Sequence, residues 1–117
     1  MGKRLIVPIA SSKALQIALE DSETSYFIRT NFSYPEQNPK IYSHKWISRN
    51  GQRYKWNIEI IEKFKLSLVC EEELLNIALI EVDSNSGKII KRQYLRNVLA
   101  SEYKRFLRKK RTADNLA

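Results

Sequence analysis

The chain has 117 residues, of which 43% are hydrophobic and 29% are charged, which suits one domain with its own core. Glycine and proline contribute only three residues each, so the composition excludes collagen-like repeats and argues against intrinsic disorder. One cysteine and one histidine exclude an internal disulfide and a self-contained Cys/His zinc site. Lysine and arginine outnumber the acids by 21 to 13, for a net charge of +8, which favours polyanionic partners.

The N-terminal segment has basic residues before a short apolar run that Pro8 interrupts. This run is shorter than the roughly 7–15 residues of a signal-peptide core, so it predicts a buried strand over residues 4–9. No stretch reaches the roughly 18–20 apolar residues of a membrane span. Three scattered glycines supply no phosphate-binding glycine motif. We therefore expect a cytoplasmic protein with no membrane span, no cofactor and no metal.

Two elements are predicted before the first proline-rich loop. Ser11 and Ser12 are candidate N-caps for a helix over Lys13–Leu19. The next segment, Thr24–Phe32, is rich in β-branched and aromatic residues and predicts a strand.

The Asn50-Gly51 pair is the strongest local signal, because it suits the two positive φ angles of a type I′ hairpin turn. The flanking strands are Ile41–Arg49 and Gln52–Ile61, and the turn sets Ile47 opposite Tyr54. One face of this hairpin is then apolar and is expected to meet the core: Ile41, Ile47, Tyr54, Trp56, Ile58 and Ile60. The other face carries Tyr42, His44, Trp46, Ser48, Arg53, Lys55, Asn57 and Glu59.

A second hairpin is predicted further along the chain. Alternation over Lys63–Val69 indicates another strand or a bent continuation of the preceding one. Residues 71–80 fit either a helix or a strand, although the part from Ile77 to Asp83 favours a strand. The cluster Asp83–Gly87 is typical of a turn, and Lys88–Lys91 returns as the partner strand.

From Tyr94 to Arg111 the apolar spacing becomes helical. Residues 112–117 have no apolar anchor and are expected to fray, so the domain spans residues 1–111. The predicted fold is α+β: an antiparallel sheet of about five strands, an N-terminal helix and a long basic C-terminal helix. The apolar stripe of that helix consists of Leu95, Val98, Leu99, Tyr103, Phe106 and Leu107.

The positive charge is concentrated near the C-terminus. Between Lys88 and Arg111 there are ten lysines or arginines and one acid, whereas Glu71–Asp83 holds five acids and no base. Clustered cations displace counterions from phosphates, so this segment predicts nucleic-acid binding without catalysis. The predicted phosphate contacts are Lys104, Arg105, Arg108, Lys109, Lys110 and Arg111.

The polar face of the first hairpin is a secondary candidate for the same interface. Aromatic rings interleaved with cations suit single-stranded nucleic acid, because bases stack on the rings while the cations hold phosphates. The residues concerned are Tyr42, Trp46, Arg53 and Lys55. The sequence leaves open whether the target is DNA or RNA.

Two other functions remain as alternatives. The basic segment also suits a module that docks an acidic protein partner. A small ribonuclease is the second alternative, although Tyr54 falls on the opposite hairpin face from the other members of its set: His44, Arg53, Tyr54 and Lys55. The carboxylates of Glu81 and Asp83, two apart on a predicted strand, offer a weaker nuclease site with a divalent metal.

Overall fold

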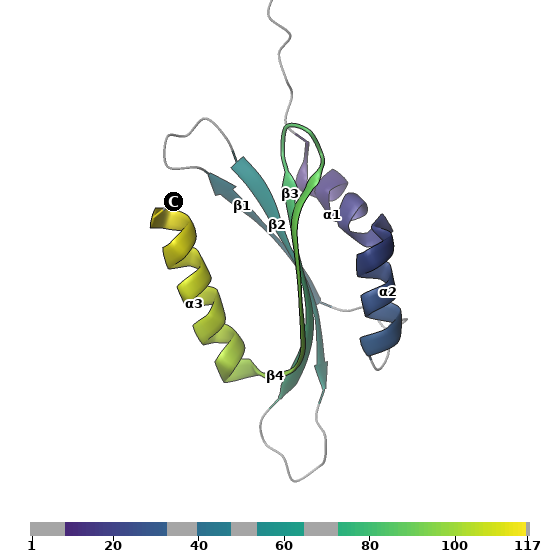
Figure 1. Ribbon diagram of the computed structural model, residues 1–117, viewed down its shortest axis with the longest axis vertical. Helices are drawn as coiled ribbons and strands as arrows, with labels where there is room; N and C mark the ends of the chain where they lie inside the picture. Colours follow the sequence, from purple (N-terminus) through teal and green to yellow (C-terminus); the bar gives the residue numbers. More distant parts are fainter. Residues whose placement is uncertain (1–8, 33–39, 48–53, 65–72, 117) are drawn as a thin grey trace, which may run out of the picture.

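A four-stranded antiparallel sheet separates two helical layers (Figure 1). The computed structural model describes residues 9–32, 40–47, 54–64 and 73–116, with the backbone alone for 44–47, 54, 64 and 111–116. Helices α1 (Ser11–Glu20) and α2 (Ser22–Asn31) lie on one face of the sheet, and α3 (Ala100–Leu116) lies on the other. The strands, which pair in chain order, are β1 (Lys40–Ile47), β2 (Tyr54–Phe64), β3 (Leu74–Asp83) and β4 (Ile89–Leu99).

The α+β class is confirmed, but the described residues form four strands rather than about five. The strand expected at residues 4–9 and most of the one expected at Lys63–Val69 fall outside the described residues. The strand expected at Thr24–Phe32 is a helix instead. No helix in the described part of the chain is long and apolar enough to cross a membrane.

Helix α1 forms where the sequence predicts it, but its N-cap differs. The N-cap residue is Ala10, which makes no capping hydrogen bond with its side chain, and both Ser11 and Ser12 lie inside the first turn. Ala14 and Ala18, one turn apart, are fully buried. Their small side chains let the helix approach the sheet closely, and that contact stabilises α1 without a side-chain cap.

Helix α2 replaces the strand that Thr24–Phe32 was expected to form. Its N-cap is Asp21, whose carboxylate accepts hydrogen bonds from the Thr24 backbone N–H (3.0 Å) and from Thr24 Oγ1 (2.9 Å). Phe27 is buried and its ring stacks on that of Tyr94 at a centroid distance of 4.5 Å. The cap and this burial outweigh the β propensity of the segment, which is a weak preference in any case.

The register of the first hairpin is confirmed. Ile47 lies opposite Tyr54 and Ile41 opposite Ile60, although the Asn50-Gly51 turn itself lies outside the described residues. Ile58 and Ile60 are fully buried against α1 and α2, and Trp56 packs against the same cluster. Ile41 departs from the expectation, because this edge-strand residue is 36% exposed.

In the second hairpin, residues 74–80, which fit either a helix or a strand by sequence, belong to strand β3. Gly87 has a φ of +73°, and its N–H donates to the Asp83 carbonyl at 2.9 Å. A positive φ favours glycine, which explains the position of this residue in the turn. The Asp83 N–H in turn donates to the Lys88 carbonyl at 2.9 Å, so strand pairing begins directly beyond the turn.

The C-terminal helix differs from the prediction, because residues 94–99 belong to β4 and α3 begins at Ala100. The apolar residues of 94–99 fit either element, and the long β3 strand offers them backbone partners as far as Leu74, which pairs with Leu99. Asn97 lies within β4 where the register with β3 shifts, and it has a φ of +53°, a conformation that asparagine tolerates better than most residues. Residues 112–116, which were expected to fray, are part of α3.

The sheet has a separate apolar cluster on each face. The cluster under α1 and α2 is built on Ile58, Ile60, Ala78, Ile80 and Val82. The cluster under α3 consists of Ile61, Leu75, Ile77, Leu79 and Tyr103, with Leu95, Val98, Phe106 and Leu107 packed against it. The face of β2 that was expected to be polar is therefore partly covered, because α3 lies over it.

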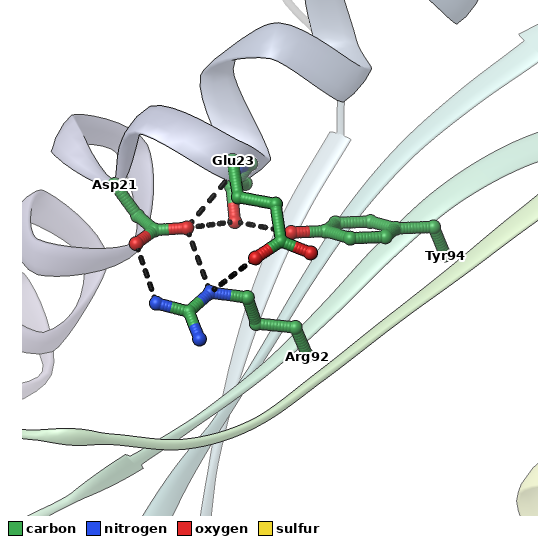
Figure 2. Close-up of polar contacts among 5 residues, drawn as sticks. Asp21, Glu23, Arg92 and Tyr94 are labelled. Atoms are coloured by element: carbon green, nitrogen blue, oxygen red, sulfur yellow. Dashed lines mark hydrogen bonds and ion pairs between the residues drawn. The ribbon is translucent and has the colours of Figure 1, made fainter.

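A cluster of polar side chains connects the α1–α2 junction to β4 through hydrogen bonds and ion pairs (Figure 2). Arg92 donates to both carboxylate oxygens of Asp21, at 2.9 Å from Nε and 2.8 Å from Nη2, and lies 3.4 Å from Glu23. The hydroxyl groups of Thr24 and Tyr94 are 3.1 Å apart and extend the network. The hydrogen bond from Arg92 lowers the pKa of Asp21 to about 2, against the opposing effect of burial.

Candidate nucleic-acid interface

The solvent side of α3 carries four exposed cations on two adjacent turns, here called the basic face: Lys104, Arg105, Arg108 and Lys109. The opposite side of the helix is apolar. Tyr103 is 4% exposed, and Phe106 and Leu107 pack beside it on the sheet. Contact with the sheet therefore fixes the rotation of α3, and with it the direction in which the basic face points.

Helix stability does not account for the basic face. Because α3 continues to Leu116, its last turn contains no basic residue, and the helix dipole acts mainly within the last turn. Lys104 and Arg108 are four residues apart, as are Arg105 and Lys109. Like charges at this spacing destabilise a helix by about 0.2–0.5 kcal/mol per pair. The spacing of these cations therefore opposes the stability of α3 rather than adding to it.

Lys110 and Lys55, two other predicted phosphate contacts, are occupied within the protein. Lys110 Nζ lies 3.1 Å from Oε2 of Glu81, and Lys55 Nζ donates to Oε1 of the same carboxylate. The side chains of Lys110 and Glu81 are 9% and 5% exposed. Burial raises the pKa of Glu81, but the hydrogen bonds from Lys55 and Lys110 outweigh it and leave that pKa below its usual value. These three residues, the Glu81 cluster, join α3 to β2 and β3.

Next to the Glu81 cluster lies a buried amide. Asn57 is directly opposite Glu81 in the β2–β3 register and opposite His44 in the β1–β2 register. It is fully buried, and neither its Nδ2 nor its Oδ1 has a hydrogen-bond partner among the described residues. An unsatisfied buried polar group costs about 1–3 kcal/mol, which makes this amide unusual in a native structure.

The remaining predicted residues are not gathered at the basic face. Tyr42 is 43% exposed on β1, at the opposite sheet edge from β4, the strand that leads into α3. Arg53 and the side chains of Trp46 and Arg111 lie outside the described part of the protein. Of the set considered for a ribonuclease, the structure describes only the Lys55 side chain, which is held by Glu81.

The sequence reasoning counted Glu81 and Lys91 among the charges but assigned neither a place at this interface: Glu81 as a partner of lysines, and Lys91 as a neighbour of Glu81. Lys91 is exposed on β4 and lies directly opposite Glu81 in the β3–β4 register. The sequence did contain a signal for Glu81, which is a single acid at a buried position within the apolar strand β3. A buried carboxylate needs cationic or hydrogen-bonding partners, so an acid within an apolar strand indicates a lysine or arginine nearby in the fold.

A shallow hollow of about 500 Å³ lies beside the α1–α2 junction. Its lining includes the cations Lys88 and Arg92 and the acids Glu20 and Asp21. Arg92 and Asp21 neutralise each other there, so the hollow lacks the single sign of charge that distinguishes the basic face.

Comparison with known proteins finds no matching family model, no matching curated protein and no matching solved structure. The functional inference therefore depends on the geometry and charge of the chain itself.

Proposed function

We propose that this protein binds nucleic acid, without catalysis, through the basic face of α3. The observation that carries the proposal is the exposure of four cations on two adjacent turns of a helix whose other side is packed on the sheet. Such a face can contact the phosphates of DNA or RNA, since phosphate contacts carry no sequence information by themselves.

Two features of the structure support this proposal over a purely structural role for the charge. The like-charge pairs of the basic face oppose helix formation, and no basic residue lies in the last turn. Lys55 and Lys110, by contrast, are lysines that pack inside the fold, and the buried carboxylate of Glu81 neutralises their charge. Lys104, Arg105 and Lys109 of the basic face are exposed and suit an external anion.

The test is fluorescence anisotropy across a salt series with labelled duplex DNA, single-stranded DNA and RNA. The variant replaces Lys104, Arg105 and Lys109 with glutamine and leaves Arg108, which has a further interaction within the protein. We expect weaker binding and a log–log salt slope that is smaller by about 2 to 3, since each lost phosphate contact removes about 0.7–0.9.

A matched control removes the same charge elsewhere, by replacing the exposed residues Lys13, Arg29 and Lys88 with glutamine. The control should keep nearly the wild-type salt slope. If the wild-type protein binds none of the probes at moderate salt, or if both triple variants weaken binding equally, the proposal is wrong. Co-purification of an acidic protein with nucleic-acid-free wild type would then favour the protein-docking alternative.

A further inference from the structure

The C-terminal part of α3 meets the sheet at a carboxylate that two lysine amines contact, with a third lysine beside it on the next strand. Glu81 pairs with Lys55 from β2 and with Lys110 from α3. Lys91 of β4 is its direct cross-strand neighbour. Two elements therefore bring a lysine amine to Glu81, which is 4% exposed, and β4 places a third lysine opposite it in the register.

Lys91 lies on the α3 side of the sheet. From Lys91 to Leu95 the β3–β4 register is regular, so Lys91 and Leu95 lie on the same face of the sheet. Leu95 packs against the apolar cluster under α3. Arg92 and Tyr94 alternate with these residues and contact α2 on the other side. Since Lys110 also touches Glu81, the exposed Lys91 continues the positive charge of α3 onto the edge strand of the sheet.

Asn57 supplies the second observation. It lies on the same side of β2 as Lys55 and Ile61, directly opposite Glu81, with both amide atoms unpartnered among the described residues. Directly opposite residues on one face of a sheet have Cβ atoms about 4.5–5.5 Å apart. The Asn57 Nδ2 group is thus within reach of the Glu81 carboxylate, which in this structure is turned to the lysines instead.

We infer that Lys55, Lys91 and Lys110 form a second phosphate-binding point beside the basic face, at which a nucleic-acid phosphate displaces the Glu81 carboxylate from its lysines. This inference rests on the proposed function. It adds Lys91 to the residues that bind phosphate, and it makes Glu81 a competitor of the phosphate for the lysines. The ligand is a backbone phosphate of the nucleic acid that the basic face holds.

The displacement is balanced by hydrogen bonds inside the protein. A buried carboxylate that loses two ammonium partners requires new donors, and an amide that is buried without partners requires an acceptor. When a phosphate takes the lysines, the Glu81 carboxylate turns to Asn57 Nδ2, which gives the carboxylate one new donor and the amide nitrogen its acceptor. In the structure, the Glu81 carboxylate lies between Lys55 and Lys110, at the position that the phosphate would take.

The experiment measures binding of single-stranded DNA and RNA oligonucleotides of the same sequence to Glu81→Gln, Lys91→Gln and a control, Lys13→Gln. Glu81→Gln removes the competing charge and should tighten binding by about threefold to tenfold, the effect of one unit charge about 4 Å from a phosphate at the dielectric constant of water. Lys91→Gln should weaken binding and reduce the single-strand salt slope by about 0.7. Lys13 lies on α1, across the sheet, and Lys13→Gln should bind as the wild type does.

The Asn57 side-chain amide provides a direct readout of the exchange. Its NMR resonance should shift when the oligonucleotide is added to the wild-type protein. Inorganic phosphate at matched ionic strength distinguishes the source of the anion, and a shift with phosphate alone, but not with the oligonucleotide, overturns the nucleic-acid assignment. Lys91 is exposed, so the Lys91→Gln variant keeps the test valid even if Glu81→Gln does not fold.

The failures of the two proposals are distinguishable. If Glu81→Gln and Lys91→Gln bind like the wild type while the triple variant of the basic face loses binding, this inference is wrong and the proposed function stands. If the triple variant binds like the wild type, the proposed function is wrong and this inference falls with it.

Discussion

Arg92 on β4 holds the carboxylate of Asp21 through two hydrogen bonds, at 2.9 Å and 2.8 Å, across 71 residues of sequence (Figure 2). Asp21 is at the same time the N-cap of α2. One side chain therefore starts a helix and ties that helix to the sheet, and this pairing raises the pKa of Arg92 as it lowers that of Asp21.

Replacing Asp21 should expose both of these roles. Asp21→Ala removes the cap and the ion pair, and we expect a loss of about 1–2 kcal/mol in the free energy of unfolding. Asp21→Asn keeps a capping oxygen and should lose less. Urea denaturation at neutral pH measures both, and an unchanged midpoint in Asp21→Ala would contradict the assignment.

The same pair predicts the pH dependence of stability. Because the folded state lowers the pKa of Asp21 from 3.8 to about 2, the ionised form stabilises the fold. This contribution is complete above the unfolded pKa and is lost as the pH falls through the folded pKa. The stability difference between the wild type and Asp21→Asn should therefore shrink between about pH 4 and pH 2 in denaturation curves. A difference that stays constant over this range would contradict the pKa shift.

Asn76 should be one of the most sensitive polar positions of the fold. It is 3% exposed, its Nδ2 donates to the Asn31 carbonyl (3.0 Å) and to Glu62 Oε1 (3.1 Å), and its Oδ1 accepts from the Asn97 N–H (3.1 Å). Asn76→Ala removes these three hydrogen bonds, one of them to the buried carboxylate of Glu62, and should cost about 2–3 kcal/mol. Asn85→Ala, in the exposed turn, is the control and should change stability by less than about 0.5 kcal/mol. Equal losses in the two variants in urea denaturation would refute the role given to Asn76.

Neighbouring lysines of α3 should differ in what they stabilise. Lys110→Gln weakens a buried charged hydrogen bond to Glu81 and should cost about 1.5–3 kcal/mol, whereas the exposed Lys109→Gln should stay within about 0.5 kcal/mol. Because Lys55 and Lys110 lower the pKa of Glu81, the effect of Lys110→Gln should decrease as the pH falls below the ordinary value of 4.5. Thermal unfolding of the two variants across pH measures this, and equal stability of both at neutral pH would be the contrary result.

Local turn chemistry was the part of the fold most accessible from the sequence. The register from Ile47–Tyr54 to Ile41–Ile60 follows from a two-residue turn, because loop length fixes the pairing on either side. The position of the second hairpin was also predictable, because the turn cluster Asp83–Gly87 contains a glycine that can adopt the positive φ of the turn.

Elements whose apolar pattern suits two structures were decided by tertiary contacts. Thr24–Phe32 has the composition of a strand, yet Asp21 caps it and Phe27 packs on Tyr94, which is distant in sequence. Residues 94–99 have the spacing of a helix, yet the length of β3 gives them strand partners. Both partners lie far along the chain, so no local window contains the information.

The sequence by itself determined the α+β class, the register of the first hairpin, the turn of the second and the concentration of positive charge near the C-terminus, because these depend on composition and on residues close together in the chain. The tertiary structure alone decided which lysines face solvent. Packing of Tyr103 on the sheet sets the rotation of α3, and this rotation exposes Lys109 while it brings Lys110 to Glu81. A count of charges treats the two lysines alike, and only the position of a buried carboxylate 29 residues away separates them.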